Sequence, residues 1–205
     1  MNRGAMSTVR VRFLSLCLPF AQLAAGCGAA PAGEPPLAGA AIGGPFELVD
    51  SKGETVRWSD FDGKYRMIYF GYAYCPDVCP LDVQRMMQGY NRFKQDEPAR
   101  AAQVQPLFVT VDPERDTPEV VGEFAAAFSD DLVGLTGTPE QVAKAAKAFA
   151  VFYAKGEVSE AGGYMMDHSR AAYLRGRKGE PIALLPVEAQ DGADGVAAEL
   201  ERWVS

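Results

Sequence analysis

The sequence predicts a single α/β domain in which a mixed central sheet is flanked by helices. Short apolar segments alternate with helix-forming segments between residues 65 and 149, a pattern typical of strands and helices in alternation. Two further apolar segments, 171–174 and 181–185, predict a closing hairpin, and residues 195–203 predict a final helix. The chain has 205 residues and no internal repeat, which fits one domain with an N-terminal extension.

The first half of the domain predicts three strands and a helix. Residues 46–49 and 54–57 are typical of two short strands around a turn. The segment 65–70 is apolar and aromatic, so we expect it to form a buried central strand. Residues 81–93 are rich in good helix formers, and Pro98 marks the end of that helical region.

The second half continues the alternation. Two helix starts share one signature, a threonine suited to the N-cap followed by a proline at the first helical position. The predicted elements, in chain order, are a strand at 104–111, a helix beginning at Thr117–Pro118, a strand at 132–135, a helix over 142–149 announced by Thr138–Pro139, and an extended segment at 151–153. With the closing hairpin and helix, this order is that of a thioredoxin-like fold.

Residues 1–27 predict an export signal. Arginines at positions 3, 10 and 12 precede the apolar stretch 13–25, which is too short and interrupted for a membrane span of about 20 apolar residues. Residues 23–27, Leu-Ala-Ala-Gly-Cys, resemble a bacterial lipobox, so we expect lipidation of Cys27. Simple secretion and an uncleaved anchor remain alternatives. The expected location is extracytoplasmic and membrane-anchored, facing the bacterial periplasm.

Residues 28–45 are almost entirely Gly, Ala and Pro and predict a tether, which leaves 46–205 as the folded domain. The net charge of the chain is -7. Because three of its 20 basic residues lie in the leader, the mature chain carries 17 basic against 27 acidic residues, a net charge of -10. Such an acidic chain argues against nucleic-acid binding, which requires basic groups to neutralise phosphates.

The folded domain keeps two cysteines, Cys75 and Cys79, and the single histidine of the chain, His168. The two cysteines stand where the buried strand gives way to the first helix. A three-residue gap places both sulfurs on one face, within reach of one metal ion or of each other as a redox disulfide. If Cys79 lies in the first helical turn, the helix dipole favours its thiolate.

Two thiolates and one imidazole suit copper, because soft sulfur ligands select Cu(I) and an imidazole also accepts Cu(II). A structural zinc site requires four protein ligands, but Asp77 or Asp167 could supply the fourth, so zinc stays open. A purely structural disulfide is a further alternative, although closing so short a loop stabilises a fold weakly. Met165 and Met166 are either extra soft ligands or core residues, and a core position is the commoner use of methionine.

Four motifs resemble the signatures of one family. They are Phe70–Pro80 (FGYAYCPDVCP), Phe108–Glu119 (FVTVDPERDTPE), Leu132–Gln141 (LVGLTGTPEQ) and Asp167–Ser169 (DHS), and together they resemble the Sco/SenC family of copper proteins in the same order over residues 46–186. The resemblance implies a thioredoxin-like fold with copper held by Cys75, Cys79 and His168. It also implies delivery of copper to the binuclear site of cytochrome c oxidase, or maintenance of that site's cysteines, so the expected partner is the oxidase subunit or another copper protein.

Two functions remain open at this point. The first is a copper metallochaperone, and the second is a thiol–disulfide oxidoreductase that acts on the cysteines of a partner protein. Three residues between the cysteines, rather than the two of thioredoxin-type motifs, favour metal binding. A peroxidase is a weaker third reading, because the domain has no distant cysteine to resolve an oxidised Cys75. Residues 112–116 are expected to form a turn and helix start rather than to bind metal.

Overall fold

The computed structural model describes Met1, Gly4, residues 33–160 and residues 162–205. The predicted leader and Cys27 therefore lie outside the described residues. A five-stranded mixed sheet forms the centre of the domain, in the order β5-β4-β3-β8-β9. Its strands are β3 (Tyr65–Gly71), β4 (Val104–Thr110), β5 (Val133–Leu135), β8 (Ala172–Arg175) and β9 (Pro181–Leu185). The predicted α/β, thioredoxin-like architecture is confirmed.

The middle of the sheet follows directly from the composition of its strands. All seven residues of β3 are buried, and β4 is buried almost throughout, as expected for apolar strands covered on both faces. Strand β3 pairs parallel with β4 on one side and antiparallel with β8 on the other. Strand β3 is therefore the middle strand of the sheet, and its C-terminal end leads into the cysteine motif.

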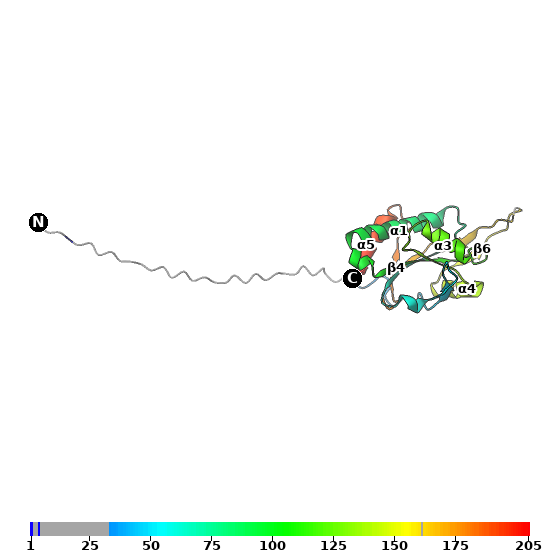
Figure 1. Cartoon of the computed structure of the whole chain (residues 1–205), viewed down its shortest axis with the longest axis horizontal. Helices are drawn as coiled ribbons and strands as arrows, with labels where there is room; N and C mark the ends of the chain where they lie inside the picture. Colours follow the sequence, from blue (N-terminus) through cyan, green and yellow to red (C-terminus); the bar gives the residue numbers. More distant parts are fainter. Residues whose placement is uncertain (2–3, 5–32, 161) are drawn as a thin grey trace. The chain divides into compact units, whose positions relative to one another are not determined.

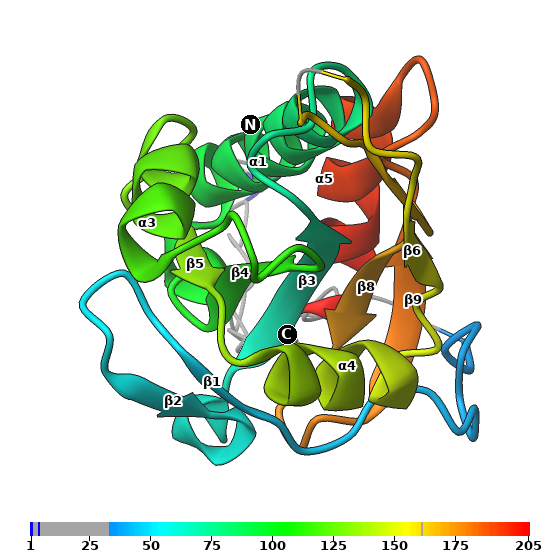
Figure 2. The same cartoon turned by 90° about the vertical axis from the view of Figure 1, so that its right-hand side faces the viewer.

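Helices cover both faces of this sheet. Helices α1 (Val78–Asp96) and α5 (Gly192–Trp203) pack against each other on one face, and α4 (Pro139–Ala148) lies on the opposite face (Figures 1 and 2). Helix α3 (Pro118–Ala126) packs beside β5, and the short α2 (Pro98–Ala101) follows α1. Thr117 and Thr138 cap α3 and α4 as predicted, each accepting a hydrogen bond from a backbone N–H of the first turn. Helix α1 begins three residues earlier than predicted, at Val78.

Two small sheets complete the fold. Strands β1 (Glu47–Val49) and β2 (Thr55–Arg57) form a hairpin that leads into a 3-10 helix, η1 (Trp58–Phe61). Strands β6 (Tyr153–Lys155) and β7 (Met166–His168) form a second hairpin, in which Tyr153 stands opposite His168. Strand β7 was not predicted, so the structure places the histidine on a strand rather than in a loop.

The predicted tether is wrong over its C-terminal part. The backbone N–H of Leu37 donates to the carbonyl of Ile182 at 3.0 Å, and Gly43 donates to Ala148 at 2.6 Å. The guanidinium of Arg175 donates to the Ile42 carbonyl, which a composition argument could not foresee. The described residues 33–160 and 162–205 belong to one compact unit. Only residues 28–32 retain the tether prediction, and they lie outside the described part of the chain.

Within the described residues, no helix combines the length and the apolar character that crossing a bilayer requires.

Candidate metal centre

The turn from β3 into α1 brings the two cysteines into the buried interior. Gly71 ends β3, and a Cβ at this position would stand 2.8 Å from the Tyr69 ring and 3.2 Å from the sulfur of Cys79. Only glycine leaves room for the strand to turn this closely against the thiol. The loop is then fixed from the side, because Ala73 donates its backbone N–H to the buried carboxylate of Asp116 at 2.8 Å. Residues 112–116, predicted as a turn and helix start, thus also support the cysteine loop through Asp116.

The structure brings the predicted donor atoms together. The Nε2 atom of His168 lies 3.2 Å from the Sγ atom of Cys79. The backbone N–H of Cys79, in the first turn of α1, donates to the Sγ atom of Cys75 at 3.4 Å, so the Cys75 sulfur in the preceding loop lies against the start of the helix. Both cysteines are unlinked thiols, Cys75 7% exposed and Cys79 fully buried.

The surroundings of His168 select the tautomer that a metal requires. The Nδ1 atom lies 2.9 Å from the carbonyl oxygen of Ser169. Because a carbonyl can only accept, Nδ1 carries the proton, and the lone pair of Nε2 points toward Cys79. Burial also lowers the pKa of His168. The imidazole is therefore neutral at pH 7, with its free nitrogen directed at the thiols.

The two thiols differ in acidity. Burial alone would raise the pKa of Cys75, but hydrogen bonds from the backbone N–H groups of Asp77 and Cys79 and from nearby side chains outweigh it, and the pKa is lowered. Burial raises the pKa of Cys79 well above its ordinary value. The expected thiolate at Cys79 is wrong, because burial and then the interaction with Cys75 raise its pKa. Cys75 is the thiolate-prone member of the pair.

We expect Cys75 to react first with iodoacetamide in the metal-free protein at pH 7. The thiolate is the reactive species, and the lower pKa and slight exposure of Cys75 both favour it. Peptide mapping after partial alkylation should find Cys75 modified at least about tenfold more often than Cys79. In a Cys79→Ala control the Cys75 rate should fall, since one stabilising hydrogen bond is lost. Equal labelling of the two cysteines would contradict this assignment.

A buried ion pair lies directly behind the site. Arg170 binds the carboxylate of Asp82 through Nε at 2.9 Å and Nη2 at 2.7 Å, and the Tyr69 hydroxyl donates to the same carboxylate at 2.9 Å. Asp82 is fully buried and stands one helical turn after Cys79, while Arg170 stands two residues after His168. The pair therefore ties the helix that carries one donor to the segment that carries another.

A second arginine joins the cysteine loop to the β6–β7 hairpin. The guanidinium of Arg115 lies 3.7 Å from the ring centre of Tyr164, and it also faces the rings of Tyr72 and Tyr74. It donates to the Tyr164 carbonyl at 2.9 Å and forms an ion pair with Asp112. Tyr164 precedes β7, so this contact holds the hairpin, and with it His168, against the loop. Neither Arg170 nor Arg115 was singled out from the sequence, because an isolated basic residue is typical of a surface position.

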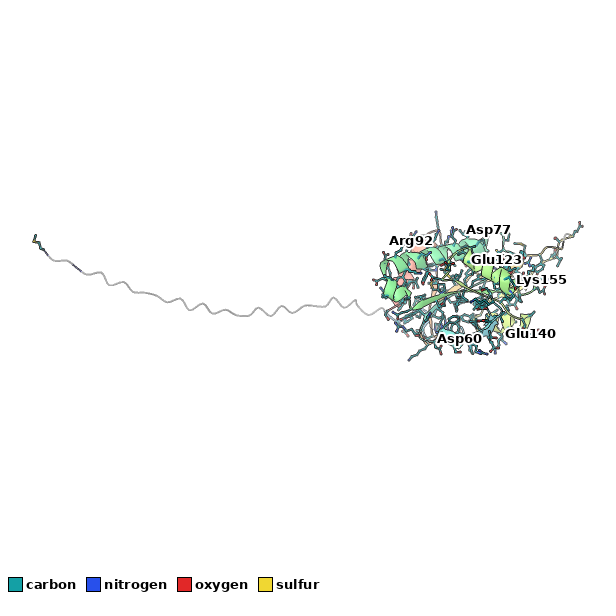
Figure 3. All side chains as sticks on the ribbon, viewed as in Figure 1. Asp60, Asp77, Arg92, Glu123, Glu140 and Lys155 are labelled. Atoms are coloured by element: carbon teal, nitrogen blue, oxygen red, sulfur yellow. The ribbon has the colours of Figure 1, made fainter. Side chains whose placement is uncertain are left out.

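The two carboxylates considered as extra ligands do not join the donors. Asp77, labelled in Figure 3 near the start of α1, and Asp167 on β7 are both exposed. Among the described residues, no group of three or more His, Cys, Asp or Glu side chains is already arranged to hold a metal ion. The thiols and the imidazole therefore converge without forming a closed coordination shell, and neither exposed carboxylate belongs to that group in the structure.

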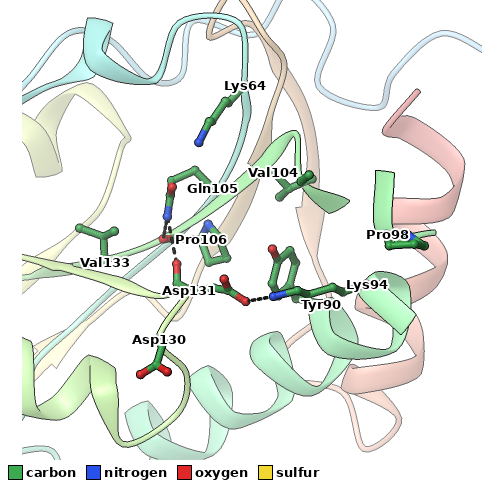
Figure 4. A pocket seen from close by; sticks show the side chains of 11 residues that line it. Lys64, Tyr90, Lys94, Pro98, Val104, Gln105, Pro106, Asp130, Asp131 and Val133 are labelled. Atoms are coloured by element: carbon green, nitrogen blue, oxygen red, sulfur yellow. Dashed lines mark hydrogen bonds and ion pairs between the residues drawn. The ribbon is translucent and has the colours of Figure 1, made fainter. Parts of the chain in front are cut away.

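A separate surface pocket lies elsewhere on the domain. It has a volume of about 400 Å³, and Figure 4 shows the ion pair of Lys94 and Asp131 beside it, with Tyr90 and Gln105 in its lining. Lys94 is about 22 Å along α1 from Cys79, from the rise per residue of a helix. No thiol or imidazole lines this pocket, so it is not part of the candidate metal centre.

Comparison with known proteins gives one family. A match to the SCO1/SenC family covers residues 34–205. The human "Protein SCO1 homolog, mitochondrial" is 41% identical over 139 residues, which is 68% of this chain and 46% of that protein. "Protein SenC" of Rhodobacter capsulatus is 42% identical over 137 residues, 67% of this chain and 60% of that protein. This chain thus matches about half to three fifths of the length of these relatives.

Solved structures give the same result. Arabidopsis thaliana ScoI with copper bound superposes with a TM-score of 0.68 at 34% identity, covering 80% of this chain and all of that chain (100%). Yeast Sco1 with copper bound superposes with a TM-score of 0.68 at 33% identity, covering 78% of this chain and 87% of that chain.

Proposed function

Because this chain belongs to the SCO1/SenC family, we propose that it binds copper through Cys75, Cys79 and His168 and transfers it to an acceptor protein. The observation that carries the proposal is the 3.2 Å contact between the Cys79 sulfur and the free Nε2 of His168. A neutral imidazole whose Nδ1–H donates to a backbone carbonyl is the form of histidine that metal sites use. Copper is the cargo of such a protein rather than a resident cofactor.

The donor set supports copper over zinc. Two thiols and one imidazole form a small, soft site; Asp77 and Asp167 are exposed, and the buried Asp82 is already paired with Arg170. Two similar proteins, the Arabidopsis and yeast structures, contain copper. Two thiolates neutralise the charge of Cu(II) and leave one negative charge with Cu(I), so both states can be accommodated in this partly buried position.

For the acceptor, we propose the binuclear copper site of cytochrome c oxidase or another exported copper protein. This follows from the family resemblance of the four motifs rather than from the geometry of the site. For the location, we propose an extracytoplasmic domain held at a membrane by a lipid on Cys27. The small-residue sequence before Cys27 supports that anchor.

A second candidate function is thiol–disulfide exchange with a partner protein. The unequal acidity of the two thiols favours it, because a thiolate-prone Cys75 can attack a disulfide and Cys79 can then resolve the mixed disulfide. This chemistry uses both cysteines and gives His168 no necessary role. The histidine therefore separates the two functions.

We expect the protein with reduced thiols to bind one copper ion per chain, as Cu(I) and as Cu(II). Thiolate-bound Cu(II) should give a sulfur-to-copper charge-transfer band, and metal analysis should give a stoichiometry of one. Because Cys79 is protonated at neutral pH, uptake should release its proton, and apparent affinity should rise about tenfold per pH unit. A folded, reduced protein that takes up zinc but neither copper state would contradict the proposal.

A further inference from the structure

Two adjacent methionines at the start of β7 have different environments. Met166 is 9% exposed and belongs to the hydrophobic core, as is usual for methionine. Met165 is 50% exposed, so about half of this residue is open to solvent. A core role thus accounts for Met166 and leaves Met165 unexplained.

The sulfur of Met165 is directed toward the metal centre through Tyr72. The Tyr72 hydroxyl donates to the Sδ atom of Met165 at 3.8 Å. Tyr72 also belongs to the cysteine loop, since its carbonyl accepts a hydrogen bond from the backbone N–H of Cys75 at 3.3 Å. The Tyr72 ring meets the His168 ring edge-on, with 5.8 Å between their centres. Tyr72 therefore connects the Met165 sulfur to the cysteine loop and to the His168 ring.

Exposure sets the order in which an arriving ion meets these sulfurs. Cys79 is fully buried and Cys75 is 7% exposed, whereas Met165 is 50% exposed. A thioether is a soft ligand that suits Cu(I), and it has no proton to lose before it binds. Hydrogen-bonding to Tyr72 also keeps the Met165 side chain on the side of the thiols.

We propose that Met165 is an entry ligand for Cu(I), which it captures at the surface and passes to Cys75. The inference rests on the proposed copper-binding function. The steps are ligand exchanges without change of oxidation state: the bond from copper to its donor breaks as the bond to Met165 forms. The Met165 bond then breaks as the Cys75 bond forms, and any thiol proton released goes to solvent.

The test is the rate of Cu(I) transfer from its bathocuproine disulfonate complex to the metal-free protein, followed anaerobically by the loss of the complex's absorbance. Met165→Leu keeps size and apolarity but removes the sulfur, and Met166→Leu is the matched control. We expect Met165→Leu to slow loading at least fivefold and to leave the equilibrium Cu(I) affinity within twofold of the parent. Met166→Leu should load at the parent rate. Equal rates for Met165→Leu and the parent, or equal slowing in both variants, would overturn the proposal.

A second measurement observes the ligand directly. In a Cys75→Ser/Cys79→Ser protein with ¹³C-labelled methionine methyl groups, one equivalent of Cu(I) should shift the Met165 methyl signal and leave that of Met166 in place. An unshifted Met165 signal would overturn the inference. If the parent protein binds no Cu(I), the proposed function itself fails; if the parent binds normally and only the Met165 effects are absent, this inference alone fails.

Discussion

Replacing His168 by alanine should abolish stable Cu(II) binding while Cu(I) binding stays measurable. The variant keeps two thiolates, which can hold Cu(I) at low coordination number, but it loses the only nitrogen donor that contacts them among the described side chains. Because Cu(II) prefers nitrogen donors and more of them, its affinity should fall at least about 100-fold. Titration of each copper state into the variant, with the charge-transfer band as the signal for Cu(II), measures the change.

The control for this variant is Asp167→Asn, which alters the exposed neighbour of the histidine and should bind both copper states like the parent. Cys75→Ser and Cys79→Ser should each lose both states. In cells with scarce copper, His168→Ala should also fail to support cytochrome oxidase activity. If His168→Ala binds Cu(II) like the parent and restores the oxidase fully, the ligand assignment is wrong and thiol–disulfide exchange becomes the better function.

Replacing Arg170 by methionine should lower the free energy of unfolding by about 3 kcal/mol. The change leaves the fully buried carboxylate of Asp82 without its ionic partner, and breaking a buried pair from one side costs roughly 3–5 kcal/mol. We expect the lower end of this range, because the Arg170 side chain is 30% exposed and solvent weakens the ion pair. Guanidinium denaturation of the metal-free variant and parent gives the difference.

The matched control is the double variant Asp82→Asn with Arg170→Met, which removes the buried charge together with its partner. The double variant should recover a large part of the lost unfolding free energy, because an amide at position 82 can still accept the hydrogen bond from the Tyr69 hydroxyl. A double variant as unstable as Arg170→Met would show that loss of packing, and not an uncompensated charge, sets the stability. The two outcomes separate the electrostatic role of the pair from a steric one.

The sheet was predictable because its signal is local. The runs 65–70 and 104–111 are mainly apolar, and the threonine–proline pairs at 117–118 and 138–139 start helices by their own chemistry. The start of α1 was placed too late because a proline is accepted anywhere in the first turn, so Pro80 fixes the start only within a turn. Strand β7 was missed because its three residues are ordered by pairing with β6 across an intervening loop.

In the candidate site, too, the local chemistry of each residue was predictable, whereas its distant contacts were not. The cysteines and the histidine could be named from their chemistry and from the motifs that resemble the family, and the structure brings Cys79 and His168 into contact. Their acidities could not be predicted, because burial of the Cys79 thiol depends on the whole core. The pairing of Asp82 with Arg170 could not be predicted either, since the two residues are far apart in the sequence and each alone is typical of a surface position.

The docking of residues 33–45 onto the domain limits how far the domain can travel from an anchor. If a lipid is attached at Cys27, only the six residues up to Gly33 separate it from the described unit, and Leu37 is already bonded to β9. Six residues cannot span more than about 20 Å even when fully extended. The domain would then be confined to a thin layer above the bilayer, and an acceptor would have to present its copper site at that height to meet it.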